Sequence, residues 1–170
     1  MPLIIPAIDV KSGKTYFFSS INKRNKISDE FIYENNISLG KAVRASCSYP
    51  LIFSPCNYEQ TDLVDGGIRE NIPWKTLKQN GADRVLCVKF SKDFEGESCK
   101  NIIDVVSNSF DILCHELSNY ELNGVDCLLN IKTKNISLLD ISKIDELYNI
   151  GYKYAKENIY KIKSCLINNN

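Results

Sequence analysis

Apolar positions in the first part of the chain fall into short extended runs. Residues 2–10 and 15–19 are rich in β-branched and aromatic side chains, and the turn residues between them include Gly13. This pattern is typical of two strands joined in a hairpin. Residues 21–36 are polar and irregular, with a charged run at 23–26, which predicts a solvated loop.

The next stretch predicts a helix followed by a strand. Small and apolar residues follow Ser38 at helical spacing, and Pro50 stands beyond them. Ser38 is therefore expected to cap a helix that cannot continue past Pro50. Residues 58–64 have the composition of a strand.

An acidic residue and two glycines follow this strand as Asp65-Gly66-Gly67. Both glycines can adopt positive φ, so we expect a tight turn that aims the Asp65 carboxylate out of the sheet edge. Glycine also lets another backbone approach the turn closely. Asn71 is expected to cap a helix with Pro73 in its first turn.

The second half of the chain alternates helical and extended patterns. A short helix is predicted from residue 74 to Gly81, and residues 84–90 carry consecutive apolar positions that are typical of a strand covered on both faces. A buried strand is predicted again at 127–131, and a terminal helix at 144–162. The long helix between these strands has one apolar face, formed by Ile102, Val106, Phe110, Leu113 and Leu117. Alternating helices and strands predict βαβ-type units.

Composition narrows the class of protein without identifying it. The chain has 170 residues, of which 44% are hydrophobic and 25% charged, as in an ordinary globular domain. Twenty-one basic and twenty-one acidic residues leave no net charge. This balance argues against nucleic acid as a partner.

Cysteine spacing indicates reduced thiols and disfavours a metal site. Seven cysteines are scattered through the chain without a CxxC pair, and His115 is the single histidine. Dispersed thiols with one imidazole do not provide the ligand spacing of a metal site. We therefore expect no metal and no cofactor.

No targeting or membrane-spanning segment is apparent from the sequence. The sequence does not open with a basic and then apolar leader, and no apolar run approaches the roughly 20 residues that a membrane-spanning helix needs. A cytoplasmic location is expected. The asparagine tail at residues 168–170 is expected to be disordered.

Two motifs surround the acidic turn and carry a family resemblance. The first begins at Ala45 and reads ASxxxPxxFxP, and the second begins at Asp65 and reads DGGxxxNxP. Together they resemble the patatin-like phospholipases, which are serine-dependent lipid acyl hydrolases with a Ser-Asp dyad. The family's glycine-rich oxyanion loop and GxSxG nucleophile motif are absent from these 170 residues.

The resemblance implies a role for each residue of the second motif. Asp65 matches the dyad aspartate, whereas Gly66, Gly67, Asn71 and Pro73 match residues that form the turn and support the site. The implied fold is α/β, a three-layer sheet with flanking helices that is incomplete at its N-terminal side. Residues 1–167 would be the C-terminal portion of the domain, and the substrate a lipid or another ester.

Three functional hypotheses follow from this pattern. The chain is part of a lipid acyl hydrolase that is inactive without a nucleophile, or a non-catalytic pseudoenzyme, or a module that binds lipid or a partner. Ser46 lacks the GxSxG context of a nucleophile, and His115 lies on an amphipathic helix, so both are expected to be structural or surface residues. An incomplete sheet predicts poor solubility, oligomerisation, or a second polypeptide that carries GxSxG.

Overall fold

The computed structural model describes residues 2–21, 29–91, 99–133 and 140–167. The predicted disorder of the tail at 168–170 and the charged run at 23–26 lie outside these residues. The chain divides into two compact units. The first consists of Met1–Pro73 and Val105–Glu121, and the second of Trp74–Asp104 and Leu122–Asn170.

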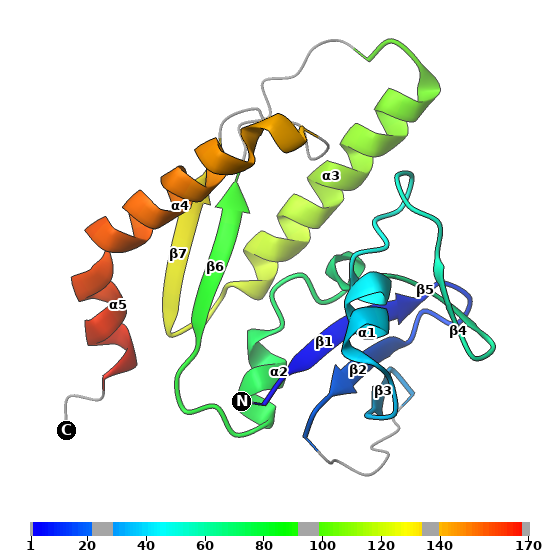
Figure 1. Ribbon diagram of the computed structural model, residues 1–170, viewed down its shortest axis with the longest axis horizontal. Coiled ribbons are helices and arrows are strands. Elements are labelled where there is room, and N and C mark those ends of the chain that lie inside the picture. Colours follow the sequence, from blue (N-terminus) through cyan, green and yellow to red (C-terminus); the bar gives the residue numbers. More distant parts are fainter. Residues whose placement is uncertain (1, 22–28, 92–98, 134–139, 168–170) are drawn as a thin grey trace. The chain divides into compact units, whose positions relative to one another are not determined.

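A five-stranded sheet forms the centre of the first unit (Figure 1). Its strand order is β3-β2-β1-β5-β4, and its neighbours are antiparallel except for the parallel pair β2 and β3. The strands are β1 (Ile4–Asp9), β2 (Thr15–Ser19), β3 (Phe31–Glu34), β4 (Cys56–Tyr58) and β5 (Thr61–Asp65). The pairing of β1 with β2 confirms the predicted hairpin, and Gly13 in its turn has φ of 72°.

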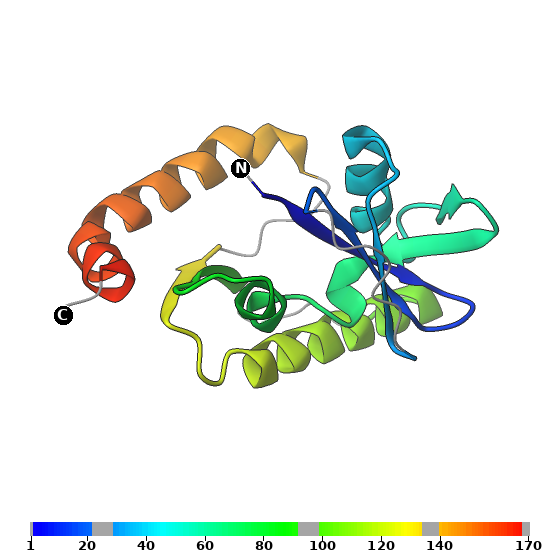
Figure 2. The same ribbon diagram turned by 90° about the horizontal axis from the view of Figure 1, so that it is seen from below.

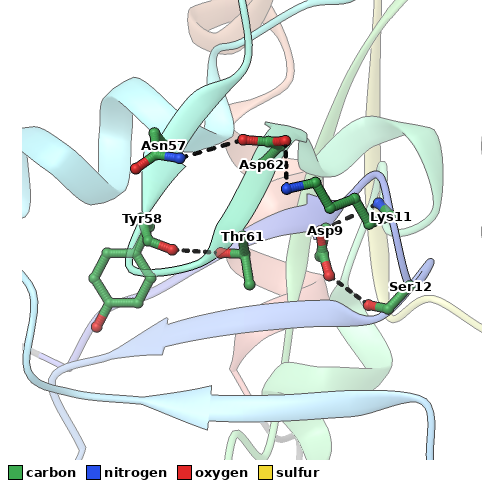
Figure 3. Close-up of polar contacts among 7 residues, drawn as sticks. All are labelled: Asp9, Lys11, Ser12, Asn57, Tyr58, Thr61 and Asp62. Atoms are coloured by element: carbon green, nitrogen blue, oxygen red, sulfur yellow. Dashed lines mark hydrogen bonds and ion pairs between the residues drawn. The ribbon is translucent and has the colours of Figure 1, made fainter.

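Two parts of this sheet differ from the sequence prediction. The predicted strand 58–64 is instead the hairpin of β4 and β5, with Glu59 at φ 53° in the turn and Thr61 Oγ1 donating to Tyr58 O over 2.6 Å (Figure 3). The predicted loop 21–36 contains β3, whose Tyr33 is buried, with its ring centroid 5.2 Å from that of Phe17 of β2 in a tilted arrangement. Non-local pairing with β2 therefore overrides the polar character of this stretch.

Helices lie on both sides of this sheet (Figure 2). Helix α1 (Leu39–Ser46) begins as predicted, because Ser38 Oγ accepts a hydrogen bond from Lys41 N over 3.4 Å. Its Ala42 and Ala45 are buried in the core. Helix α3 (Ile102–Glu121) confirms the predicted long helix, and its residues from Val105 onward belong to the first unit.

The second unit contains a two-stranded parallel sheet. Strand β6 (Leu86–Ser91) pairs in parallel with β7 (Cys127–Lys132), as expected of a βαβ connection. The helices of this unit are α2 (Trp74–Gln79), α4 (Ile144–Glu157) and α5 (Ile159–Leu166). Gly81, after α2, has φ of 95°, which agrees with its predicted role in ending that helix. These elements and the first sheet confirm the α/β class.

Strand β6 is covered on one face only, so the prediction of two covered faces is wrong. Cys87 and Lys89 are buried, whereas Leu86, Val88 and Phe90 are exposed, Phe90 by 65%. The consecutive apolar residues of a parallel strand thus leave one face uncovered within the described part of the chain.

The predicted terminal helix is two helices. Helix α4 ends at Glu157 and α5 begins at Ile159, with Asn158 between them at φ −98° and ψ 11°. The Asn158 side chain donates to Tyr154 O over 2.9 Å. This local hydrogen bond competes with the regular helix and accounts for the break.

Candidate functional site

Asp65 is the last residue of β5. The residue pairs with Ala7 of β1, and its N–H donates to Ser48 O over 3.1 Å. Its carboxylate Oδ1 accepts a hydrogen bond from Gly67 N over 2.7 Å, which begins the short 3₁₀ helix η1 (Gly66–Ile68). The backbone and one carboxylate oxygen of Asp65 are therefore fixed.

The other carboxylate oxygen has a different environment. Asp65 is half-buried, and among the described residues its side chain accepts no hydrogen bond besides that from Gly67. Burial raises the pKa of Asp65, and the hydrogen bond from Gly67 N opposes this shift. A partly desolvated carboxylate with one uncommitted oxygen is suited to accept a proton from an incoming hydroxyl.

Close contacts, not the positive φ that the sequence suggested, explain the glycine at position 66, and the space beside Gly67 is also narrow. A Cβ on Gly66 would lie 2.5 Å from Pro6 O of β1, and one on Gly67 would lie 3.0 Å from Asp65 Oδ1. Neither glycine has positive φ. The expectation that glycine admits a neighbouring backbone is confirmed by Pro6.

Asn71 and Pro73 do not take the positions in a helix that the sequence predicted. Helix α2 begins at Trp74, so Pro73 lies directly before it and not in its first turn. The Asn71 side-chain amide donates to Ser118 Oγ of α3, and its Oδ1 would lie 3.1 Å from a Cβ on Gly67. Asn71 thus joins the turn to α3.

A polar face of α3 holds the segments before and after Asp65. Ser118 Oγ donates to Cys114 O of its own helix over 2.7 Å, and Ile72 N donates to Glu121 Oε2 over 2.9 Å. Asp111 Oδ1 accepts a hydrogen bond from Tyr49 OH over 2.6 Å. Sequence reasoning missed these roles because it followed the apolar face of α3. The i, i+7, i+10 spacing of Asp111, Ser118 and Glu121 was the available signal.

Burial and neighbouring charges favour the protonated forms of Tyr49 and Cys114. Burial raises the pKa of Tyr49, and its hydrogen bond to Asp111 adds to the shift. Burial also raises the pKa of the Cys114 thiol, with smaller contributions from Asp111 and Asp65. Because a thiolate is the nucleophilic form of cysteine, Cys114 is poorly suited to replace a serine.

Ser46 and His115 occupy the positions expected of structural and surface residues. Ser46 is the last residue of α1. His115 Nδ1 lies 3.3 Å from Glu116 Oε1 and 3.3 Å from Asn119 Nδ2, both on its own helix. Neither residue donates a hydrogen bond to the Asp65 side chain.

Other kinds of site find little support in the described part of the chain. No group of three or more histidine, cysteine or acidic side chains there is arranged to hold a metal ion. None of the seven cysteines, all of which lie in the described part of the chain, forms a disulfide. Among the same residues no helix has the length and apolar character needed to span a membrane.

The site thus has an acidic residue at the end of β5 and a glycine, Gly66, packed against β1, and we call it the Asp65 corner. Residues 3–78 match the patatin-like phospholipase family. This match contains all of the turn from Asp65 to Pro73 and confirms the resemblance to that family drawn from the two motifs.

Several fungal proteins named lysophospholipase NTE1 are similar to the chain. The protein from Meyerozyma guilliermondii is 27% identical over 88% of this chain and 12% of its own length. The one from Debaryomyces hansenii is 26% identical over 82% of this chain and 11% of its own length. The chain therefore spans about a tenth of the length of these relatives.

Proposed function

We propose that this chain is part of a serine-dependent lipid acyl hydrolase, in which Asp65 is the base of a Ser-Asp dyad. The observation that carries the proposal is the state of the Asp65 carboxylate. One oxygen is held by Gly67 N at 2.7 Å, and the other accepts no hydrogen bond among the described residues. The family match and the lysophospholipase relatives support a lipid ester as the substrate.

The chemistry follows from the position of this oxygen. A serine hydroxyl placed against it would transfer its proton to Asp65 as the serine oxygen bonds to the acyl carbon. The proton would then pass to the departing alcohol oxygen, and a water molecule would repeat the sequence to release the fatty acid. Burial assists because it raises the pKa of Asp65 toward the range in which the carboxylate is a useful base.

The serine and the oxyanion donors would come from a polypeptide segment that carries GxSxG. These 170 residues contain no such motif. The exposed Leu86, Val88 and Phe90 of β6 support a further segment against that sheet, since parallel sheets are normally covered on both faces. In this proposal the isolated chain supplies the base and is inactive alone.

The second candidate is a non-catalytic protein that binds lipid or a partner through the same corner. The observation that favours it is that Asp65 also caps η1 by accepting from Gly67 N. A carboxylate in this position stabilises a turn without performing chemistry. The two candidates differ in whether Asp65 exchanges a proton with a substrate.

A serine-directed fluorophosphonate probe and an ester substrate distinguish them. The probe is expected not to label the isolated chain. In a longer chain that restores GxSxG, Asp65→Asn is expected to lower ester hydrolysis about 10²–10⁴-fold. Asp62→Asn is the matched control, because Asp62 lies on the same strand and its carboxylate pairs with Lys11 at 2.7 Å (Figure 3).

Hydrolysis by the restored chain that is equal for the wild type and Asp65→Asn would contradict the role of Asp65. Labelling of a serine in the isolated chain would contradict the requirement for a second segment. A restored chain that folds and binds lipid but has no esterase activity would favour the non-catalytic candidate.

A further inference from the structure

An apolar loop precedes β4 in the first unit. We use this name for residues 49–55, which join the end of α1 to β4 (Figure 1). Three consecutive large apolar side chains lie at its centre. Leu51 is 58% exposed, Ile52 38% and Phe53 51%. Contiguous apolar exposure of this kind marks a surface that contacts a partner, a ligand or a membrane.

The apolar loop is held by hydrogen bonds. Phe53 N donates to Tyr49 O over 2.9 Å, and Ile52 N donates to the same oxygen over 3.3 Å. The Arg44 guanidinium of α1 donates to Ser54 O over 3.0 Å and also to Ser48 Oγ. These contacts fix both ends of the loop, so its apolar side chains are presented on a defined backbone.

The backbone at Leu51 is strained. Its φ is 70°, in the left-handed region that a bulky L-residue rarely adopts. Glycine would occupy this position at lower cost, yet the chain has an exposed leucine there. Strain that is retained at an exposed residue points to a role for its side chain.

The apolar loop is joined directly to the Asp65 corner. The residue before it, Ser48, accepts the hydrogen bond from Asp65 N. Its first residue, Tyr49, contacts α3 through Asp111, and the Tyr49 ring lies 5.5 Å from that of Phe110 in an edge-on arrangement. Leu51, Ile52 and Phe53 are thus carried on the segment that positions the candidate base.

We propose that Leu51, Ile52 and Phe53 insert into a lipid surface and so bring the Asp65 corner to lipid molecules. This inference rests on the proposed function for its substrate class. Three neighbouring apolar side chains suit the acyl region of a lipid aggregate, and Arg44 at the base of the loop suits the polar layer above it. Because the chain has no net charge, apolar burial and not electrostatic attraction provides the binding.

Flotation with uncharged phosphatidylcholine vesicles tests this proposal on the 170-residue chain, because lipid-bound protein rises in a density gradient and aggregates do not. The wild type is expected to float at both low and high salt, since apolar binding is not screened. Phe53→Ser is expected to lower the bound-to-free ratio about tenfold or more, because it removes a large apolar side chain that would otherwise insert into the lipid.

Leu51→Gly provides a signature that a structural role would not produce. It removes the apolar side chain and also relieves the left-handed strain, so we expect weaker flotation together with an equal or higher thermal unfolding midpoint. Leu113→Ala is the matched control, because Leu113 is an exposed leucine on α3, outside the loop. Its flotation is expected to equal that of the wild type.

Two further results separate this proposal from the proposed function. A restored chain with Asp65→Asn is expected to float with the vesicles but to lose ester hydrolysis. If the restored wild type floats but has no ester hydrolysis, only the hydrolase proposal would be overturned. Absence of wild-type flotation, or equal losses in Phe53→Ser and Leu113→Ala, would overturn the lipid-docking role. A loop variant that abolishes self-association in the absence of lipid would overturn it also, since the surface would then be an interface between copies.

Discussion

Two acidic turns flank the antiparallel pairing of β1 with β5 and use the same residue types differently. The Asp9 turn joins β1 to β2, and the Asp65 corner ends β5, which pairs with β1. Asp9 is buried, and its two oxygens accept from Lys11 N at 3.2 Å and from Ser12 Oγ at 2.6 Å (Figure 3). Asp65 is half-buried and has one oxygen engaged, by Gly67 N.

The glycines of the two turns also differ. Gly13 has φ of 72° with nothing within 4 Å of an added Cβ, so it is needed for its backbone conformation. Gly66 lacks positive φ and is needed because Pro6 O lies 2.5 Å from that position. Asp9, with both oxygens engaged, builds a turn, whereas the uncommitted oxygen of Asp65 is the feature on which its proposed role as a base rests.

The largest expected stability difference is between alanine variants of these two glycines. Gly66→Ala forces a Cβ into the backbone of β1, and we expect a loss of about 3 kcal/mol, at the upper end of overpacking effects. Gly13→Ala is expected to cost about 1 kcal/mol, because left-handed strain is partly offset by a less flexible unfolded chain. Urea unfolding followed by circular dichroism measures both, and equal losses would contradict the packing explanation.

The next comparison exchanges each carboxylate for an amide. Asp9→Asn places a donor among groups that all donate, so we expect a loss of about 1–2 kcal/mol. Asp65→Asn keeps an acceptor for Gly67 N and removes a partly buried charge, so its loss is expected to be within about 0.5 kcal/mol. Urea unfolding measures both stability losses. A larger loss for Asp65→Asn than for Asp9→Asn would indicate that Asp65 is primarily structural.

The smallest expected effect is the pH dependence contributed by Asp65. Its folded pKa is raised, so between the unfolded value of 3.8 and the higher folded value the native state binds more protons than the unfolded state. The stability of the wild type relative to Asp65→Asn should therefore fall as pH rises through this window, and stay constant above it. Paired unfolding curves across that range test the sign, and a rising difference would contradict it.

The parts of this fold that the sequence predicted are those with local signals. The Gly13 hairpin, the Ser38 cap and the alternation of helix and strand around α3 are set by turn chemistry, capping and periodicity. Strand β3 was missed because its stability comes from pairing with β2, which residues 31–34 alone do not reveal. The uncovered face of β6 was missed because a run of apolar residues does not reveal whether another segment packs against each face of the strand.

For the candidate site as well, the local motif was predictable and the contacts between distant segments were not. Asp65 and its glycines were identified from their motif, yet the reason for Gly66 lies in Pro6, about sixty residues earlier in the chain. The contacts of Asn71 with Ser118 and of Ile72 with Glu121 join segments about fifty residues apart. Hydrogen bonds between distant segments depend on tertiary packing, so spacing within one segment does not predict them.

The most direct test of the account is the titration of the Asp65 carboxyl group itself. Carboxyl ¹³C NMR of the chain, with Asp65→Asn to assign the signal, would follow its protonation. We predict a midpoint above 3.8, as expected of a partly desolvated carboxylate with one open oxygen. A midpoint below 3.8 would show that the hydrogen bond from Gly67 N dominates. Asp65 would then be a structural cap, and the proposed base would be contradicted.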